Sequence, residues 1–188
     1  MSLTTDENSR PFVESAVGGV AAWLFGYVFT YLLVATDIES SPLNQLVELF
    51  EGDSATYELV GWVFYNAHLV EISYSGISLF SPPRNFVGGE DGFTVVLYLV
   101  PPALLLIGGL AMGRYSGVTE PNEGAIAGAL VTPGYLILSV VGVFLFEVSV
   151  GGASGAPDLI PAVAVAGLVY PVVFGALGGV IAAVTSDR

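Results

Sequence analysis

Four long stretches of this sequence contain no charged residue and are dominated by apolar side chains: 15–36, 92–113, 124–146 and 159–186. Each is long enough to cross the hydrocarbon of a bilayer, which takes about 20 helical residues. Lipid offers no water to exposed backbone groups, and continuous apolar runs lack the alternation of barrel strands, so these stretches must be helices. The pattern predicts an all-α fold in which residues 1–188 form a single membrane domain. Four transmembrane helices are expected at about 12–36, 92–113, 122–147 and 158–185.

The segment 37–91, between the first and second predicted spans, is the only large region outside them, and it carries nine acidic residues. Ser41 followed by Pro42 is typical of the N-cap and first position of a helix, and apolar residues then recur at helical spacing. The pattern predicts amphipathic helices at about 42–51 and 55–72. We therefore expect an acidic, extracellular helical segment between the first two spans.

A fifth apolar stretch, 59–70, leaves the number of spans open. It has 12 uncharged residues, includes Asn66 and His68, and is flanked by acids on both sides. This length suits an interfacial, re-entrant or packed helix better than a span, although a fifth span remains an alternative.

The four arginines favour four spans, because basic residues beside spans tend to remain cytoplasmic. With the amino terminus inside, four spans place Arg10, Arg114 and Arg188 on the cytoplasmic side and only Arg84 outside. Five spans would divide the arginines two against two. We therefore predict a multi-pass protein of the cell membrane with both termini cytoplasmic.

Composition supports the same class, with 54% hydrophobic and 11% charged residues and a mean hydropathy of +0.77. A cleaved signal peptide is the alternative for the first stretch, but the apolar run is longer than the usual core of about 7–15 residues, and no small-residue cleavage site follows it. The net charge is −13 and there is no lysine, which favours a halophile, because concentrated salt screens crowded carboxylates. One acidic outer loop on an ordinary membrane protein is the alternative. The charge excludes nucleic acid as a partner.

One candidate site is a polar face on the predicted helix at 55–72, where Glu58, Tyr65, His68 and Glu71 fall on one side. His68 is three residues from both Tyr65 and Glu71, and this spacing leads to the hypothesis of a pH-sensitive contact. The alternative is a solvated or packed polar face without a function. With one histidine and no cysteine, we expect neither a metal site nor a cofactor, and the sequence offers no catalytic set.

Prolines near the middle of three predicted spans form a second candidate set: Pro101, Pro102, Pro133 and Pro171. Each removes a backbone donor, so we expect kinks near the bilayer midplane. Broken helices at that depth expose backbone groups to substrates in many transporters. The alternative is structural, because proline is common in membrane helices and these spans contain no deep charge.

Small residues four apart recur in every predicted span and allow close helix approach, within the chain or between copies. The pairs are Ala22 and Gly26, Gly109 and Gly113, Gly124 and Gly128, and Gly175 and Gly179. The string GASG at 152–155 matches a short motif of rhomboid proteases. We reject that enzyme, because the serine lies in a predicted outer loop and the sole histidine precedes it. We predict no enzymatic activity.

Three strings carry a resemblance over nearly the whole chain from Pro11 onward: GWVFYNAH at 61–68, LYLVPP at 97–102 and PGYLILSVVG at 133–142. They resemble an uncharacterised family of haloarchaeal multi-pass membrane proteins. The resemblance implies a halophilic archaeon and a cell-membrane location, and members are sometimes labelled transporters. It brings no family active site.

These observations lead to two functional hypotheses. The first is a small transporter-like or channel-like protein that uses the kinked helices as its path. The alternative is a non-transporting scaffold or accessory subunit of a membrane complex. Beyond the lipid bilayer, the expected partners are further copies of the chain or another membrane protein.

Overall fold

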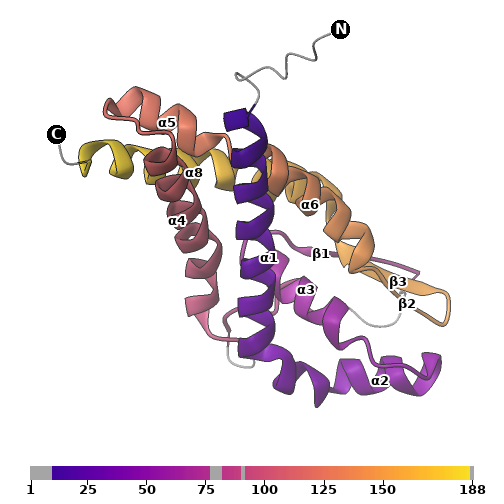
Figure 1. The fold of residues 1–188 in the computed structure, drawn as a ribbon. Coiled ribbons are helices and arrows are strands. Elements are labelled where there is room, and N and C mark those ends of the chain that lie inside the picture. Colours follow the sequence, from indigo (N-terminus) through magenta and orange to yellow (C-terminus); the bar gives the residue numbers. More distant parts are fainter. Residues whose placement is uncertain (1–9, 77–81, 90–91, 187–188) are drawn as a thin grey trace, which may run out of the picture.

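The computed structural model describes residues 10–76, 82–89 and 92–186, and it is mostly helical (Figure 1). The helices are α1 (Arg10–Glu39), α2 (Pro42–Glu51), α3 (Thr56–Asn66), the 3-10 helix η1 (Val95–Leu99), α4 (Val100–Tyr115), α5 (Pro121–Ala129), α6 (Thr132–Leu145), α7 (Leu159–Pro161), the π-helix η2 (Ala162–Val169) and α8 (Tyr170–Val184). The strands are β1 (Ile72–Ser75), β2 (Val148–Val150) and β3 (Ala153–Pro157).

Within these described residues, four helices are long and apolar enough to cross a membrane: Glu14–Glu39, Val95–Tyr115, Pro121–Leu145 and Leu159–Val184. We call them the candidate spans, and they confirm the four apolar helices predicted from the sequence. The start of α1, the end of α8 and the α4–α5 connection lie toward one end of the molecule, whereas α2 and the strands lie toward the other (Figure 1). This alternation is the arrangement that four crossings require.

The helix α2 has the ends that the sequence indicates. Ser41 caps its first turn by accepting a hydrogen bond from the backbone of Asn44, and Gly52 ends it in a left-handed conformation with a φ of 84°. Figure 1 shows α2 running across the end of α1. Its Leu49 and Phe50 side chains are exposed, so part of its apolar surface faces away from the protein.

A small antiparallel sheet corrects the all-α prediction. Its strand order is β1-β3-β2, with Ile72 opposite Pro157 and Ser75 opposite Ser154. The helix predicted at 55–72 is also too long, because α3 ends at Asn66 and the chain enters β1 at Ile72. The local pattern continues as a helix would, but pairing with β3 supplies backbone partners that only the folded chain brings close.

The prolines predicted to kink the spans lie where the regular α-helix is interrupted. Pro101 and Pro102 occupy the first turn of α4, directly after η1. Pro133 lies in the first turn of α6, after α5 ends at Ala129. Pro171 is the second residue of α8 and follows the π-helix η2. Because a proline lacks the N–H that would bond to the preceding turn, each span is interrupted at that point.

Glycines allow α8 to pack tightly against both α4 and α5. A Cβ atom added to Gly109 or Gly128 would collide with the carbonyl oxygen of Gly175, and one added to Gly124 would collide with that of Gly179. Three of the four predicted small-residue pairs therefore meet in one seam, which confirms packing within the chain.

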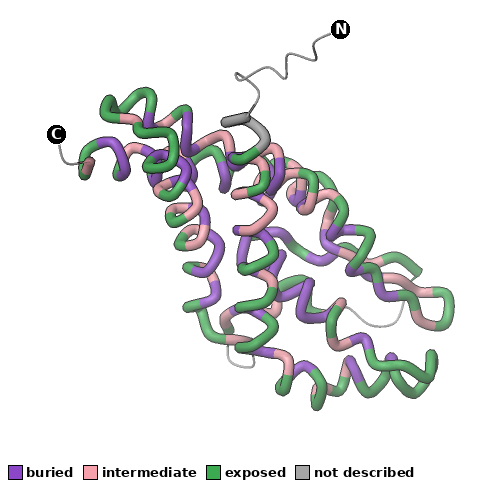
Figure 2. The backbone as a smooth tube through the Cα atoms, viewed as in Figure 1, coloured by how far each residue is buried: buried purple, intermediate pink, exposed green. Residues whose placement is uncertain are grey.

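The best-buried element is α3, whose residues from Leu59 to Asn66 are all buried (Figure 2). It contacts α1 and, through side chains, α6. The apolar stretch 59–70 is thus a packed helix and its turn, whereas the outward sides of the candidate spans are exposed. Burial of α3 positions the candidate site described next.

Candidate functional site

The structure corrects the prediction of a polar outer face. Tyr65 and His68 are each 1% exposed, Glu58 is half-buried in the first turn of α3, and Glu71 is exposed beyond the end of that helix. Tyrosine and histidine have large apolar rings, so they can be buried wherever their polar tips find partners. The side of α3 that was expected to meet solvent faces other helices instead.

His68 makes two hydrogen bonds inside the protein. Its Nδ1 lies 2.7 Å from the carbonyl oxygen of Phe64, and its Nε2 lies 2.6 Å from the hydroxyl oxygen of Tyr135. A carbonyl oxygen can only accept, so the hydrogen of the neutral ring is on Nδ1. The Tyr135 hydroxyl then donates to Nε2, and both ring nitrogens are satisfied.

Aromatic rings from two candidate spans, those of Tyr135 and Tyr170, and one ring from α3 surround His68. The ring of Tyr170 lies 5.2 Å from the imidazole, and the ring of Phe64 lies 4.7 Å away at a steep angle. Burial lowers the pKa of His68 to about 4, although its hydrogen bond to the Phe64 carbonyl opposes this shift. The imidazole is therefore neutral at neutral pH.

Two of the helix breaks converge on this histidine. Tyr135 follows Pro133 by two residues, and Tyr170 directly precedes Pro171. The structure thus brings His68 to the points where α6 and α8 begin. It does not bring Glu71 into this group, because that side chain is exposed and lies 3.9 Å from Arg84.

A second buried tyrosine hydroxyl, three residues before His68, also donates a hydrogen bond. The Tyr65 hydroxyl donates to the carbonyl oxygen of Ser139 at 2.5 Å, and burial raises the pKa of that tyrosine. Ser139 is fully buried, and its own hydroxyl oxygen has no hydrogen-bond partner among the described residues. We call His68, Tyr135, Tyr170, Tyr65 and Ser139 the His68 cluster.

A third hydrogen bond completes the attachment of α3 to α6. The indole Nε1 of Trp62 donates to the carbonyl oxygen of Phe146 at 2.7 Å. The three side chains that make these bonds are spaced three residues apart, at Trp62, Tyr65 and His68. They therefore lie on one side of α3 and the turn after it. Trp62 was not among the site residues predicted from the sequence, although the three-residue spacing of polar-tipped aromatic residues was the available signal for this attachment.

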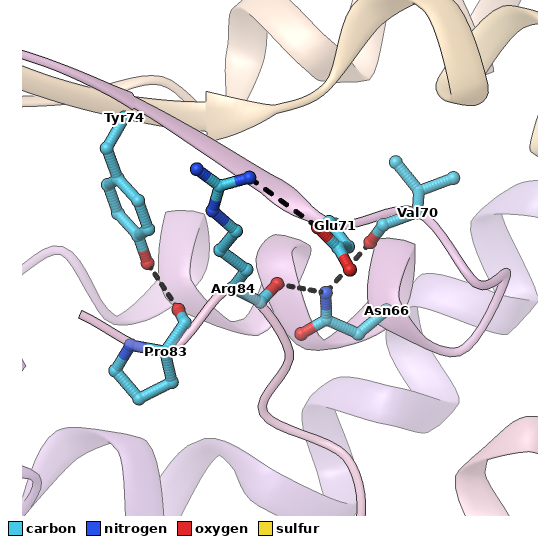
Figure 3. Close-up of polar contacts among 6 residues, drawn as sticks. All are labelled: Asn66, Val70, Glu71, Tyr74, Pro83 and Arg84. Carbon is cyan, nitrogen blue, oxygen red and sulfur yellow. Dashed lines mark hydrogen bonds and ion pairs between the residues drawn. The ribbon is translucent and has the colours of Figure 1, made fainter. Parts of the chain in front are cut away.

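Asn66 holds the end of α3 in place, a role that the sequence did not predict (Figure 3). Its Nδ2 donates to the carbonyl oxygens of Val70 at 2.8 Å and Arg84 at 3.1 Å, and its Oδ1 accepts from the backbone N–H of Phe86 at 2.8 Å. One buried side chain therefore joins α3, the turn after it and the segment that leads toward α4.

The described residues contain no group of three or more His, Cys, Asp or Glu side chains that could share a metal ion. A groove of about 690 Å³ opens where α1 ends and α2 begins, with Leu59, Pro82 and Phe93 among its lining residues. It lies toward the start of α3, whereas the His68 cluster lies beyond the other end of that helix.

The model of a family of unknown function, DUF7978, matches residues 1–186 of the chain. Comparison with curated proteins gave no match, and neither did comparison with solved structures.

Proposed function

We propose that this chain, which belongs to the family of unknown function DUF7978, is a small transporter-like or channel-like membrane protein. The observation that carries the proposal is the interruption of the regular α-helix at a proline in three of the four candidate spans. Breaks of this kind free backbone groups and let one half of a helix move against the other, as in known transporters. The buried polar contacts of His68 lie at two of these breaks.

The conformation described here is closed at the breaks. Val131 and Tyr135 beside Pro133 are almost completely buried, and α1 packs directly against both α3 and α6. A path through the bundle therefore requires α3 to move. The buried position of this short helix is tolerated because its backbone groups are satisfied within the protein.

Solute flux into high-salt liposomes tests this function. The parent protein should carry a small ion or polar solute, and replacing Pro101, Pro102, Pro133 or Pro171 by alanine should change the rate. Pro121→Ala is the matched control, because Pro121 is exposed at the start of α5 and interrupts no span. Absence of flux in the folded parent protein for a panel of ions and small polar solutes would end this proposal.

The second candidate function is a non-transporting scaffold or accessory subunit, and the dense packing at the breaks favours it. The surface for a partner would be the acidic segment around α2 and β1. Crosslinking from Glu71, which is exposed, should then capture one dominant partner, either a second copy or another membrane protein. His68 cannot serve as the crosslinking position, because it is buried.

We also propose a cell-membrane location with cytoplasmic termini in a halophilic archaeon. Arg114 lies in the last turn of α4, whose connection to α5 lies at the same end of the molecule as the start of α1 (Figure 1). The backbone carbonyl of Arg84 accepts a hydrogen bond from Ile72 in β1, toward the other end, and this division supports the proposed orientation. The net charge of −13 without lysine supports the saline environment.

A further inference from the structure

Three hydrogen bonds join α3 to α6, and only one of them involves a group that titrates in mildly acidic solution. The Trp62 and Tyr65 donors bond to carbonyl oxygens and keep their hydrogens at any ordinary pH. The bond between Tyr135 and His68 is different, because its acceptor is an imidazole nitrogen.

Protonation of His68 would reverse the direction of that bond. A hydrogen on Nε2 must donate, so the Tyr135 oxygen would have to accept and direct its own hydrogen elsewhere. Tyr135 is fully enclosed, so reorientation of its hydroxyl has little room. The bond from Nδ1 to the Phe64 carbonyl would remain as it is.

The surroundings offer no charge to stabilise an imidazolium. The titratable groups that face His68 are Tyr135 from α6, Tyr170 from α8 and Tyr65 from α3, and all three are neutral phenols. On the α1 side, the nearby ring is Trp23, which contacts Phe64.

The charged groups nearest in sequence do not change this balance. Glu71 is exposed and lies 3.9 Å from Arg84. Among the described residues, no carboxylate therefore faces the imidazole. A charged ring in this position carries the full cost of desolvation, and that cost is relieved if the ring reaches water.

The turn that holds His68 contains local strain. Leu69 adopts a left-handed conformation with a φ of 62°, and it is the only non-glycine residue with positive φ in the described part of the chain. Such a conformation is strained for leucine, because its Cβ atom lies too close to the following carbonyl oxygen. Its side chain is 62% exposed, so packing of that side chain does not hold the turn in this shape. Release of the turn would remove this strain.

We propose that His68 is a proton-binding site, and that occupation of this site releases the end of α3 from the breaks in α6 and α8. The neutral form keeps α3 between the candidate spans, and the protonated form separates Tyr135 from the ring. This movement would open the interior at the two prolines. Its ligand is a proton taken from water, so no other co-reactant is needed.

The absence of cysteine from the chain allows a direct test. Ser139→Cys places a thiol at a fully buried position under α3, and Ser73→Cys places one at an exposed reference position on β1. A dipyridyl disulfide reacts with both thiols in acid. The reaction rate at position 139 divided by the rate at position 73 is the measured ratio, and taking this ratio corrects for thiol ionisation. Between pH 7 and pH 4 we expect this ratio to rise about tenfold or more, because each pKa unit of difference between packed and released His68 gives a factor of ten.

Two further variants distinguish an effect of His68 protonation from a general weakening of the contacts between α3 and α6. His68→Gln can still donate to Phe64 and accept from Tyr135, and it should keep the ratio low at both pH values. Trp62→Phe, the matched control, removes a bond that does not titrate. It should raise the ratio at both pH values while preserving its rise in acid. Either of two results would overturn the proposal. The first is a ratio that does not change with pH when His68 and Trp62 are retained, and the second is a ratio that still rises in acid with His68→Gln.

The single histidine provides a second measurement that needs no substitution. In protein carrying isotope-labelled histidine and a purification tag without histidine, the ring nitrogens should show the Nδ1–H form at pH 7. Protonation should coincide with the rise in thiol reactivity, and protonation without that rise would also overturn the proposal. Release of α3 would be detected whether or not any solute crosses the membrane, so a failure to transport would not affect this test.

Discussion

At the scale of single residues, polar tips on large apolar side chains determine where α3 lies. Trp62, Tyr65 and His68 bury their rings, and each makes a hydrogen bond to α6 or to Phe146 directly after it. Each bond contributes about 1 kcal/mol, whereas an unpaired buried polar group would cost more than that. The main effect of these residues is therefore to fix α3 in one position, because any other position would leave their polar groups buried without a partner.

Acid should destabilise the protein through His68. Its pKa is about 4 in the folded chain and about 6.5 in the unfolded chain, so the unfolded chain binds the proton first as the pH falls. The contribution of the neutral ring is complete above pH 6.5 and is lost progressively down to pH 4. The loss should be about 3 kcal/mol.

Thermal unfolding in detergent at pH 7 and pH 4.5 measures this loss. Carboxylates titrate in the same range, so the relevant quantity is the difference between the parent protein and His68→Gln. The parent should lose more stability on acidification than the variant. Equal losses would show that His68 makes no pH-dependent contribution.

The left-handed turn predicts an unusual ranking of two substitutions at Leu69. Leu69→Gly and Leu69→Ala remove nearly the same exposed side chain, but glycine adopts a positive φ without strain. The glycine variant should be more stable than the alanine variant by about 1 kcal/mol. Denaturation in detergent measures both, and a more stable alanine variant would contradict the strain at this turn.

At the scale of elements, the sequence predicted the four apolar helices and α2 but neither the strands nor the end of α3. Uncharged runs and a capped amphipathic helix are local signals. The pairing of Ile72 with Pro157 is not, because no pattern in either segment identifies the other. The His68 cluster was only partly predictable for the same reason. Its α3 members were noticed, whereas Tyr135, Tyr170 and Ser139 come from spans that show no polar pattern.

The glycine seam makes a prediction about two neighbouring glycines in α4. Gly109→Ala would place a Cβ against the backbone of Gly175 and should destabilise the protein by about 1–3 kcal/mol. Gly108→Ala is the matched control, because its Cβ would be 3.8 Å from Ala22. It should be neutral or slightly stabilising. Thermal unfolding of both variants checks the seam, and equal effects would contradict it.

At the scale of the whole molecule, the elements divide into two ends. The α4–α5 connection, the start of α1 and the end of α8 lie at one end, and the sheet and α2 lie at the other (Figure 1). Of the arginines in the described residues, only Arg84 lies outside the first group. The proposed orientation in the membrane rests on this unequal distribution of arginines between the two ends.

Labelling of single cysteines in intact cells tests that orientation. Ser73 lies in β1, Ser116 directly follows α4, and both are exposed. In Figure 1, the strands and the α4–α5 connection lie toward opposite ends of the molecule. A membrane-impermeant maleimide should label Ser73→Cys in intact cells, and Ser116→Cys only after permeabilisation. Labelling of Ser116→Cys in intact cells would place the termini outside.

The attachment of α3 also sets an order of events during synthesis. Its three bonds to α6 and to Phe146 join residues that are 84, 74 and 67 positions apart, so the ribosome makes α3 long before the residues that receive it. Contacts this distant in the chain form late. The α6 and α8 candidate spans must therefore be made before α3 can reach its final position, and until then the apolar segment 59–70 lacks the partners that bury it. A nascent chain stopped before residue 130 would leave this segment without its native partners, in the state most prone to aggregate or be degraded.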